Sequence, residues 1–191
     1  WFPEAKLVDP FPNAQGSFGA TLDLQGSKVV IGAPGATVNG DVYRGAAYVF
    51  NRSGHVWTAL PRLYDSGGSS FYNFGASVSL DGNYIAIGEP GHTTSVNGNN
   101  YGYVGACCIY FFNGASWTFQ TKIVNPYNST PGQDFGSTVI LNQDKVLITA
   151  HSVNFFEIYT RNGVTWPMTQ HMQLIGPPTG YLVSAAWQND V

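Results

Sequence analysis

The chain carries little charge. Only 10% of its 191 residues are Asp, Glu, Lys or Arg, and the formal net charge at pH 7 is −3, whereas soluble domains contain about 25% of these residues. Binding to nucleic acid depends on Lys and Arg side chains that neutralise phosphates, so we expect no nucleic-acid partner. The sequence also lacks a run of about 18 apolar residues, the length that spans a bilayer, and we expect no membrane insertion by this segment.

Cysteine is nearly absent. The two cysteines in the sequence, Cys107 and Cys108, are adjacent and fall in a predicted strand, where neighbouring side chains point to opposite faces of the sheet. We expect two small buried hydrophobic side chains. A strained disulfide between these neighbours, or a bond to another chain, is the alternative.

Sequence signatures of catalysis are missing as well. No nucleophile elbow, phosphate-binding loop or zinc-ligand spacing is present. We therefore predict a protein that is not an enzyme, with no catalytic residue, no metal and no cofactor. The four histidines have no consistent carboxylate partner along the sequence: His55, His92, His151 and His171. Glu89 is the one acid at an unexpected position. We interpret it as hydrogen-bonded to loop backbone amides, because a lone acid lacks the partner that acid–base catalysis requires.

What the sequence does contain is an internal repeat. Four times a tryptophan is followed, 15 to 18 residues later, by a pair that opens a predicted strand. The pair is Phe-Gly in three units, and the pattern begins with Trp1 and ends with Tyr181-Leu182. The residues that define the repeat are Phe18, Gly19, Trp57, Phe74, Gly75, Trp117, Phe135, Gly136 and Trp166. A period of this length indicates one structural unit per repeat.

Each unit reads as four short strands joined by turns. In the first unit, residues 18–24 and 28–34 form two strands around a Gln25-Gly26 turn, and the next two units repeat this arrangement. Third strands are predicted at residues 46–50, 106–112 and 155–159, and the tryptophan strand follows. Short β-branched and aromatic runs between such turns are typical of antiparallel hairpins. Asp65 and Asp134, in loops before Phe-Gly pairs, are interpreted as turn formers.

Proline indicates which strand lies at the edge of each sheet. Pro3, Pro61 and Pro167 all fall in the tryptophan strand, and proline has no N–H to donate to a neighbouring strand. We place this strand at the outer edge and the second strand, with Gly32 and Gly88, in the crowded inner part. Four-stranded units that recur every 40 to 60 residues or so are typical of β-propeller blades. A β-sandwich with irregular hairpins is the alternative.

We therefore predict an all-β chain, a single β-propeller segment over residues 1–191 that is part of a larger propeller. Its three four-stranded antiparallel repeats lie at about residues 18–73, 74–134 and 135–180. Residues 1–17 would be the outer strand of a preceding blade, and residues 181–191 the start of a following one. Three blades are too few for a closed ring, so either the chain is a piece of a longer protein or neighbouring copies complete its sheets. The total blade number stays open.

Several short motifs resemble the FG-GAP repeat. They are Phe-Gly at a strand start, Ile-Gly-Ala-Pro at residues 31–34 and Gly-Ala-Ala-Tyr-Val-Phe at residues 45–50. The resemblance covers nearly the whole chain, and is strong in the first unit, good in the second and degraded in the third. It implies a β-propeller, usually of seven blades, as in the integrin α head, and an extracellular or cell-surface protein.

Integrin-type repeats carry an acidic calcium loop between the first and second strands. The connections here, residues 24–28, 80–84 and 141–145, hold at most one acid each, whereas calcium takes six to eight or so oxygen ligands, including several carboxylates. The resemblance is therefore to the calcium-free branch of the family, and we expect no calcium in these turns.

Long connections fall together at one end of such a meander: residues 35–44, 64–73, 91–104 and 125–134. Loops on a rigid scaffold are where binding residues usually lie, and Tyr and Asn provide stacking area and adaptable hydrogen bonds. The candidate residues for a partner or ligand face are Tyr43, Arg44, His92, Asn97, Asn99, Asn100, Tyr101, Tyr103 and Tyr127.

These observations favour a non-catalytic module at the cell surface or outside the cell, with a structural, adhesion or assembly role. Its expected partners are other protein chains or copies of itself. The alternative is a carbohydrate-binding module, since loop tyrosines stack on sugars and low charge suits neutral glycans. Two Asn-x-Ser/Thr triplets, at Asn51 and Asn128, are candidate N-glycosylation sites.

Overall fold

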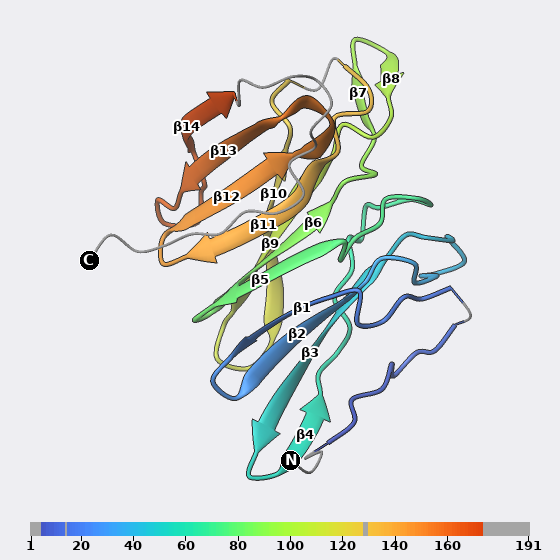
Figure 1. The fold of residues 1–191 in the computed structure, drawn as a ribbon, viewed down its shortest axis with the longest axis vertical. Coiled ribbons are helices and arrows are strands. Elements are labelled where there is room, and N and C mark those ends of the chain that lie inside the picture. Colours follow the sequence, from blue (N-terminus) through green and yellow to red (C-terminus); the bar gives the residue numbers. More distant parts are fainter. Residues whose placement is uncertain (1–4, 14, 128–129, 174–191) are drawn as a thin grey trace.

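The computed structural model describes residues 5–13, 15–127 and 130–173. Trp1, Pro3, Asn128 and the pair Tyr181-Leu182 lie outside the described residues, as does the strand expected within residues 181–191. The described chain forms three four-stranded antiparallel sheets and one two-stranded hairpin (Figure 1). The prediction of an all-β chain built from four-stranded propeller blades is confirmed. No helix among the described residues has the length and apolar character needed to cross a membrane.

The three blades follow one another along the chain. Blade 1 contains β1 (Thr21–Gln25), β2 (Lys28–Ala33), β3 (Ala46–Ser53) and β4 (Val56–Ala59). Blade 2 contains β5 (Ser77–Asp81), β6 (Tyr84–Glu89), β9 (Ala106–Phe112) and β10 (Trp117–Val124). Blade 3 contains β11 (Phe135–Asn142), β12 (Lys145–Ala150), β13 (Phe155–Thr160) and β14 (Met168–Gln173). The hairpin of β7 (Thr94–Val96) and β8 (Asn99–Tyr101) projects from the connection between β6 and β9, and a 3-10 helix covers His151–Val153.

Each blade is an up-and-down meander whose strands pair in chain order. The first strands lie side by side, with β5 between β1 and β11. Trp57 lies in β4 and Trp117 in β10, both at a sheet edge as predicted. Trp166 differs, because it lies between the Asn162–Thr165 turn and β14 and not inside the strand.

Of the three prolines assigned to the tryptophan strands, the two that the structure describes flank these strands instead of lying inside them. Pro167 directly precedes β14, and Pro61 follows the end of β4, so the prediction that both are strand residues is wrong. Leu60 and Leu63, on either side of Pro61, donate their N–H groups to the carbonyls of Val49 and Ala47 at 2.8 Å. Pro61 therefore occupies a gap in the hydrogen-bond ladder where no donor is required.

Successive blades touch through glycine. A side chain on Gly32 of β2 would place its Cβ 2.1 Å from the carbonyl oxygen of Gly75, and one on Gly88 of β6 would lie 1.9 Å from that of Gly136. The Phe-Gly pair of each following repeat thus presses its backbone against the second strand of the blade before it. Only glycine permits this approach. The expectation that Gly32 and Gly88 lie in a crowded inner part is confirmed.

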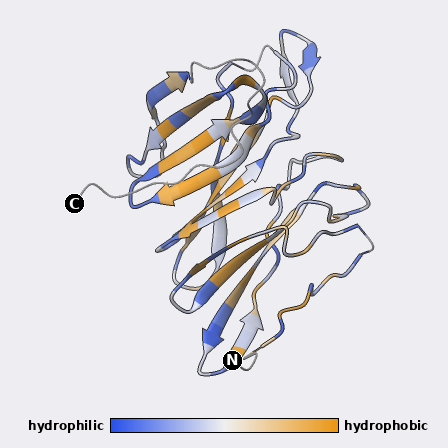
Figure 2. Cartoon of the chain, in the orientation of Figure 1, coloured by the Kyte–Doolittle hydropathy of each residue, from blue (hydrophilic) through white to orange (hydrophobic). Residues whose placement is uncertain are grey.

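Aliphatic and aromatic side chains fill the space between blades. Phe74 and Phe135 are fully buried, and each packs against a ring in the third strand of its own blade: Phe74 against Tyr110 at 6.1 Å and Phe135 against Tyr159 at 6.4 Å between ring centroids. The resulting apolar clusters lie between blades 1 and 2 and between blades 2 and 3. Figure 2 shows apolar residues along the strands of the blades, β11 and β12 among them, whereas the β7–β8 hairpin is mostly hydrophilic.

Side chains also join the first strands of neighbouring blades. The carboxylate of Asp23 in β1 accepts hydrogen bonds from the N–H of Leu80 at 2.8 Å and the hydroxyl of Ser79 at 3.2 Å. One blade further, the Ser79 hydroxyl oxygen accepts the N–H of Leu141 at 3.0 Å. Asp23 and Ser79 occupy the same position in their repeats, and each accepts a hydrogen bond from a backbone N–H of the next blade. These bonds fix the register between neighbouring blades.

The two adjacent cysteines occupy different cores. Both are free thiols, and neither is exposed. Cys107 packs in the core between blades 2 and 3, and Cys108 in the core between blades 1 and 2. Burial raises the pKa of both thiols well above the usual value, which suppresses the reactive thiolate. The interpretation of these residues as small buried hydrophobic side chains is confirmed.

The glycine contact gives a direct test of the blade packing. We expect Gly88→Ala to destabilise the protein by about 1–3 kcal/mol, because the new methyl group overlaps the Gly136 carbonyl and the blades must separate. Gly102→Ala is the matched control, since the nearest atom to its Cβ is 3.9 Å away, and it should change stability by less than about 0.5 kcal/mol. Urea unfolding measures both. Equal stability of the two variants would contradict the packing described.

Candidate functional site

The long connections gather at one end of the blades. In Figure 1 they lie on the right, whereas the tight turns within hairpins lie on the left. Backbone hydrogen bonds tie these connections together across blades: Phe71 and Asn73 donate to the carbonyls of Val42 and Tyr43 at 3.0 Å, and Gln133 donates to the carbonyl of Tyr103 at 2.8 Å. The predicted long-loop end is thus one continuous surface in the described chain, and not a set of separate loops.

Three aromatic residues on this surface adopt the left-handed backbone conformation. Their φ angles are 53° at Tyr43, 66° at Phe71 and 56° at Tyr103. A bulky residue with positive φ is an outlier, and such strain is often retained where it serves a function. The Tyr43 and Phe71 rings stack at 5.6 Å between centroids, and Tyr103 is exposed. The loops therefore hold these rings in place at an energetic cost.

The rim of this surface is apolar. Val42, Phe71, Tyr103 and Tyr127 are each between 41% and 50% exposed. Tyr127 also borders a cavity of about 280 Å³ lined by Gln133, Val153, Phe155, His171 and Gln173. The Tyr127 ring lies 5.1 Å from that of His171 and 5.8 Å from that of Phe155. Aromatic faces with amide groups beside them suit a small ring-shaped ligand.

The predicted asparagines lie on the β7–β8 hairpin. Asn97 and Gly98 form its two-residue turn with φ angles of 52° and 82°, as expected of an Asn-Gly hairpin turn. Asn97, Asn99 and Asn100 are exposed, and Tyr101 is half-buried. This hairpin extends the long-loop surface beyond the blades (Figure 1).

Arg44 lies below this surface. It is 5% exposed, and its guanidinium pairs with Asp41 at 2.9 Å and donates to the carbonyls of Asp65 at 2.8 Å and Ser66 at 2.9 Å. The structure therefore places Arg44 inside the fold, where it holds two long connections together, and its donors are not directed toward a partner.

His92 also points inward, to a cluster that the sequence did not predict. Its Nδ1 lies 3.4 Å from Oε2 of Glu89, and Glu89 is completely buried at the end of β6. The ammonium of Lys122, from β10, contacts the Asp65 carboxylate and lies 3.3 Å from Oε2 of Glu89. Glu89 was expected to accept hydrogen bonds from backbone amides. That interpretation is wrong, because its contacts are with the side chains of His92 and Lys122.

The environment of Glu89 is electrostatically unusual. Burial raises the pKa of its carboxyl group, and His92 and Lys122 oppose part of this rise. Burial lowers the pKa of Lys122, but the carboxyl groups of Glu89 and Asp65 oppose this effect, and its pKa is raised overall. Asp65, Glu89 and His92 each present a ligand-type atom within 4.8 Å of the others. However, the Lys122 ammonium lies against both carboxylates and occupies the position of a cation.

Asp65 also has the predicted turn role. Its Oδ1 accepts the N–H of Gly67 at 3.1 Å, and Asp9 and Asn125 make the same contact with Phe11 and Tyr127. These three residues each lie eight positions after a tryptophan. The prediction of a turn at Asp65 is confirmed, although its ion pair with Lys122 was missed.

A repeat signal could have identified the basic residue of the cluster. The residue five positions after each tryptophan is basic in all four units: Lys6, Arg62, Lys122 and His171. His171 has a buried acidic partner, Glu157, with Nδ1 3.2 Å from Oε1. The basic position therefore meets a buried acid in both blade 2 and blade 3, and His171 lies directly opposite Glu157 in the β13–β14 pair. These acids come from different repeat positions, so sequence spacing alone does not reveal them.

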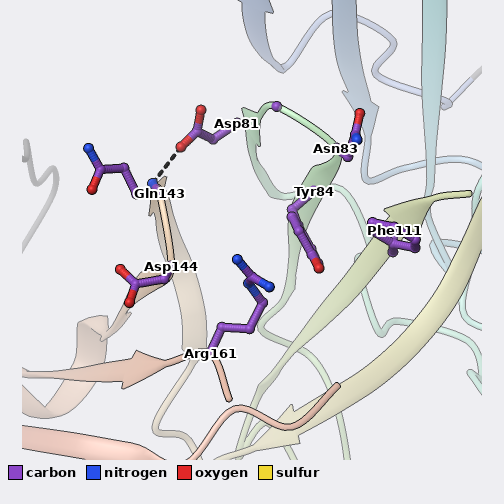
Figure 3. A pocket seen from close by; sticks show the side chains of 8 residues that line it. Asp81, Asn83, Tyr84, Phe111, Gln143, Asp144 and Arg161 are labelled. Carbon is purple, nitrogen blue, oxygen red and sulfur yellow. Dashed lines mark hydrogen bonds between the residues drawn. The ribbon is translucent and has the colours of Figure 1, made fainter. Parts of the chain in front are cut away.

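A second concavity lies at the opposite end, between blades 2 and 3. It has a volume of about 550 Å³, and Figure 3 shows Arg161 between Tyr84 and Asp144. The guanidinium carbon lies 4.7 Å from the Tyr84 ring centroid. Lys28 and Phe112 make a similar contact between blades 1 and 2, at 5.6 Å. The earlier blade supplies the cation at one interface and the ring at the other. Because a cation–ring contact recurs at both interfaces, we interpret it as part of blade packing.

Comparison with known protein families gives one match. A family described as FG-GAP repeat matches residues 1–50 and 57–104, just over half of the chain. No curated protein matches the chain.

The buried carboxyl group leads to a prediction about pH. The pKa of Glu89 is higher in the folded protein than in the unfolded chain, where it is about 4.5. The stability that Glu89 contributes is therefore fully present below pH 4.5 or so, and it is lost as the pH rises through the pKa of the folded protein. We expect the stability of Glu89→Gln relative to wild type to increase between pH 4.5 and 8. Thermal unfolding across this range measures the effect, with Asp144→Asn as the control for an acid outside the cluster. A difference independent of pH would contradict the assignment.

Proposed function

Because the chain belongs to the FG-GAP repeat family, we propose that it is an extracellular or cell-surface module that binds another protein through the long-loop end of its blades. FG-GAP repeats form β-propellers that serve mainly in protein interaction and not in catalysis. Adhesion or assembly is the role that fits this surface best. The observation that carries the proposal is the row of ordered aromatic residues with left-handed backbone at Tyr43, Phe71 and Tyr103.

The physical character of the surface supports a protein partner. Exposed apolar side chains surrounded by polar groups mark interaction sites, and aromatic residues dominate the binding energy of protein interfaces. Because the tertiary structure already fixes these rings, binding costs little conformational entropy. The asparagines of the β7–β8 hairpin add hydrogen-bonding groups at the edge of the surface.

The first blade supports the proposal of a larger propeller. Leu22 and Leu24 of β1 are 62% and 57% exposed. Their repeat equivalents include Leu80 in β5 and Leu141 in β11, which are buried in the cores between blades. A further blade, from the same chain or another copy, would cover these two leucines as blade 1 covers Leu80.

Extracellular placement also bears on glycosylation. Asn51 is half-buried in β3, where it pairs with Lys28 of β2 and Thr58 of β4. An acceptor inside a paired strand is poorly accessible to a modifying enzyme after folding, so any sugar would have to be added before blade 1 closes.

Cell attachment tests the adhesion proposal. We expect cells to attach to surfaces coated with the protein, and Phe71→Ser and Tyr103→Ser each to weaken this attachment about tenfold, the effect of losing one aromatic hot spot. Val56→Ser and Val164→Ser are matched controls, because both valines are exposed and lie at the opposite end, Val56 at the start of β4 and Val164 in the turn before β14. Wild-type attachment by the first pair, or equal loss in the controls, would rule out this surface.

A carbohydrate ligand is the second candidate, favoured by the cavity beside Tyr127. Its wall of tyrosine, phenylalanine and histidine rings with two glutamines resembles the mixture of stacking faces and amides that binds neutral ring ligands. We expect any glycan-array signal to be lost on Tyr127→Ala and to persist in Tyr103→Ala. Absence of signal in the wild-type protein would leave protein binding as the function.

A further inference from the structure

Lys122 and Asp65 form a buried contact between two blades. Asp65 belongs to the connection after blade 1 and is 5% exposed, whereas Lys122 lies in β10 of blade 2 with 18% of its side chain exposed. The Lys122 Nζ donates to Oδ2 of Asp65. The two residues are 57 positions apart in the sequence, so a bond between them would join blade 1 to blade 2.

Glu89 completes the group. It has no exposed surface, and its Oε2 lies 3.3 Å from the same Nζ. Within the described part of the chain, neither of its carboxylate oxygens accepts a hydrogen bond, although a buried carboxylate normally has several. A buried acid without hydrogen-bond donors, placed against an amine and a carboxyl group, is an arrangement that can transfer protons between them.

We propose that Lys122 and Asp65 become joined by an isopeptide bond, with Glu89 carrying the protons. The Lys122 Nζ attacks Cγ of Asp65, an N–C bond forms, and the Cγ–Oδ2 bond breaks. Two protons of the ammonium end on the departing oxygen, which leaves as water. The ammonium and carboxylate charges disappear together, Glu89 is unchanged, and no oxidant or other reactant is needed.

The local structure favours each part of this reaction. The fold holds amine and carboxyl group in contact, which removes the entropic cost of bringing them together. The N–H of Gly67 donates to Oδ1 of Asp65 at 3.1 Å, where negative charge develops when the nitrogen attacks, so it stabilises that intermediate. Formation of a neutral amide also eliminates a buried ion pair, whose desolvation is unfavourable.

The ion pair is the starting state, and the amine must lose a proton before it reacts. The pKa of Lys122 is raised overall despite its burial, so proton transfer within the group is required. Burial raises the pKa of Glu89, which makes Glu89 a better proton acceptor than an ordinary glutamate. This proton transfer sets the rate, and the bond should form slowly after folding.

The equivalent positions at the neighbouring interfaces cannot form this bond. Arg62 replaces Lys122 one repeat earlier, and a guanidinium stays protonated and delocalised. His171 occupies the position one repeat later and has no primary amine, while Asn125 replaces Asp65. Glu89 itself aligns with Ala33 and Ala150. Amine, carboxyl group and proton carrier therefore coincide at one interface among the described blades.

Intact mass spectrometry of the folded chain tests the proposal. We expect a mass lower than that of the sequence by one water molecule, and a proteolytic fragment that contains both Asp65 and Lys122 joined. Lys122→Arg and Glu89→Gln should retain the full mass, whereas Lys145→Arg, an exposed lysine on β12, should still lose water. Circular dichroism establishes that each variant is folded.

Two results would overturn the proposal. One is a folded wild-type protein that keeps its full mass after prolonged incubation, which would leave an ion pair only. The other is a water loss located elsewhere, such as a cyclic imide at Asp81-Gly82, with Asp65 and Lys122 in separate fragments. The wild-type measurement decides the matter even if a variant fails to fold. Because cell attachment is a separate assay, failure here would not count against the proposed binding surface.

Discussion

The structure depends on a backbone contact that only glycine permits. Gly32 and Gly88 leave room for the carbonyl groups of Gly75 and Gly136, so that each Phe-Gly pair lies directly on the preceding blade. This approach brings the phenylalanine rings into the cores between blades and aligns the first strands. The inter-blade hydrogen bonds of Asp23 follow from the same spacing. If the blades were further apart, all of these contacts would weaken together.

The same close packing of the blades brings the reactive side chains of the proposed cross-link together. Blades that pack closely bring the end of one outer strand against the next blade, and this places Asp65 beside Lys122 and Glu89. A buried group of charges at an interface is costly unless its members pair. The long connections then cover this interface, with Arg44 bound beneath them, and their aromatic rings face outward. The proposed binding surface and the proposed cross-link thus lie at the same end of the molecule, with the cross-link beneath the surface.

The third blade departs from this pattern. Thr149 stands where the other blades have Gly32 and Gly88, and its hydroxyl oxygen accepts the N–H of Thr138 at 3.1 Å across an irregular β11–β12 pairing. A side chain at this position removes the space that receives a Phe-Gly carbonyl. The contact between a second-strand glycine and a Phe-Gly carbonyl, which joins the described blades, therefore cannot form in the same way on the face of blade 3 that points away from blade 2.

Much of the fold could be predicted because it follows from local patterns. Strand periodicity, Asn-Gly turns and the Phe-Gly repeat determined the four-stranded blades, and the predicted β9 boundaries match the structure. The site was harder to predict. Arg44 and His92 lie in loops whose composition indicates exposure, yet both side chains point inward. The repeat could be predicted from the chain alone, because each strand and turn depends on neighbouring residues. The meeting of Lys122 with Asp65 and Glu89 is visible only in the folded protein, because contacts between blades depend on how closely the backbones approach.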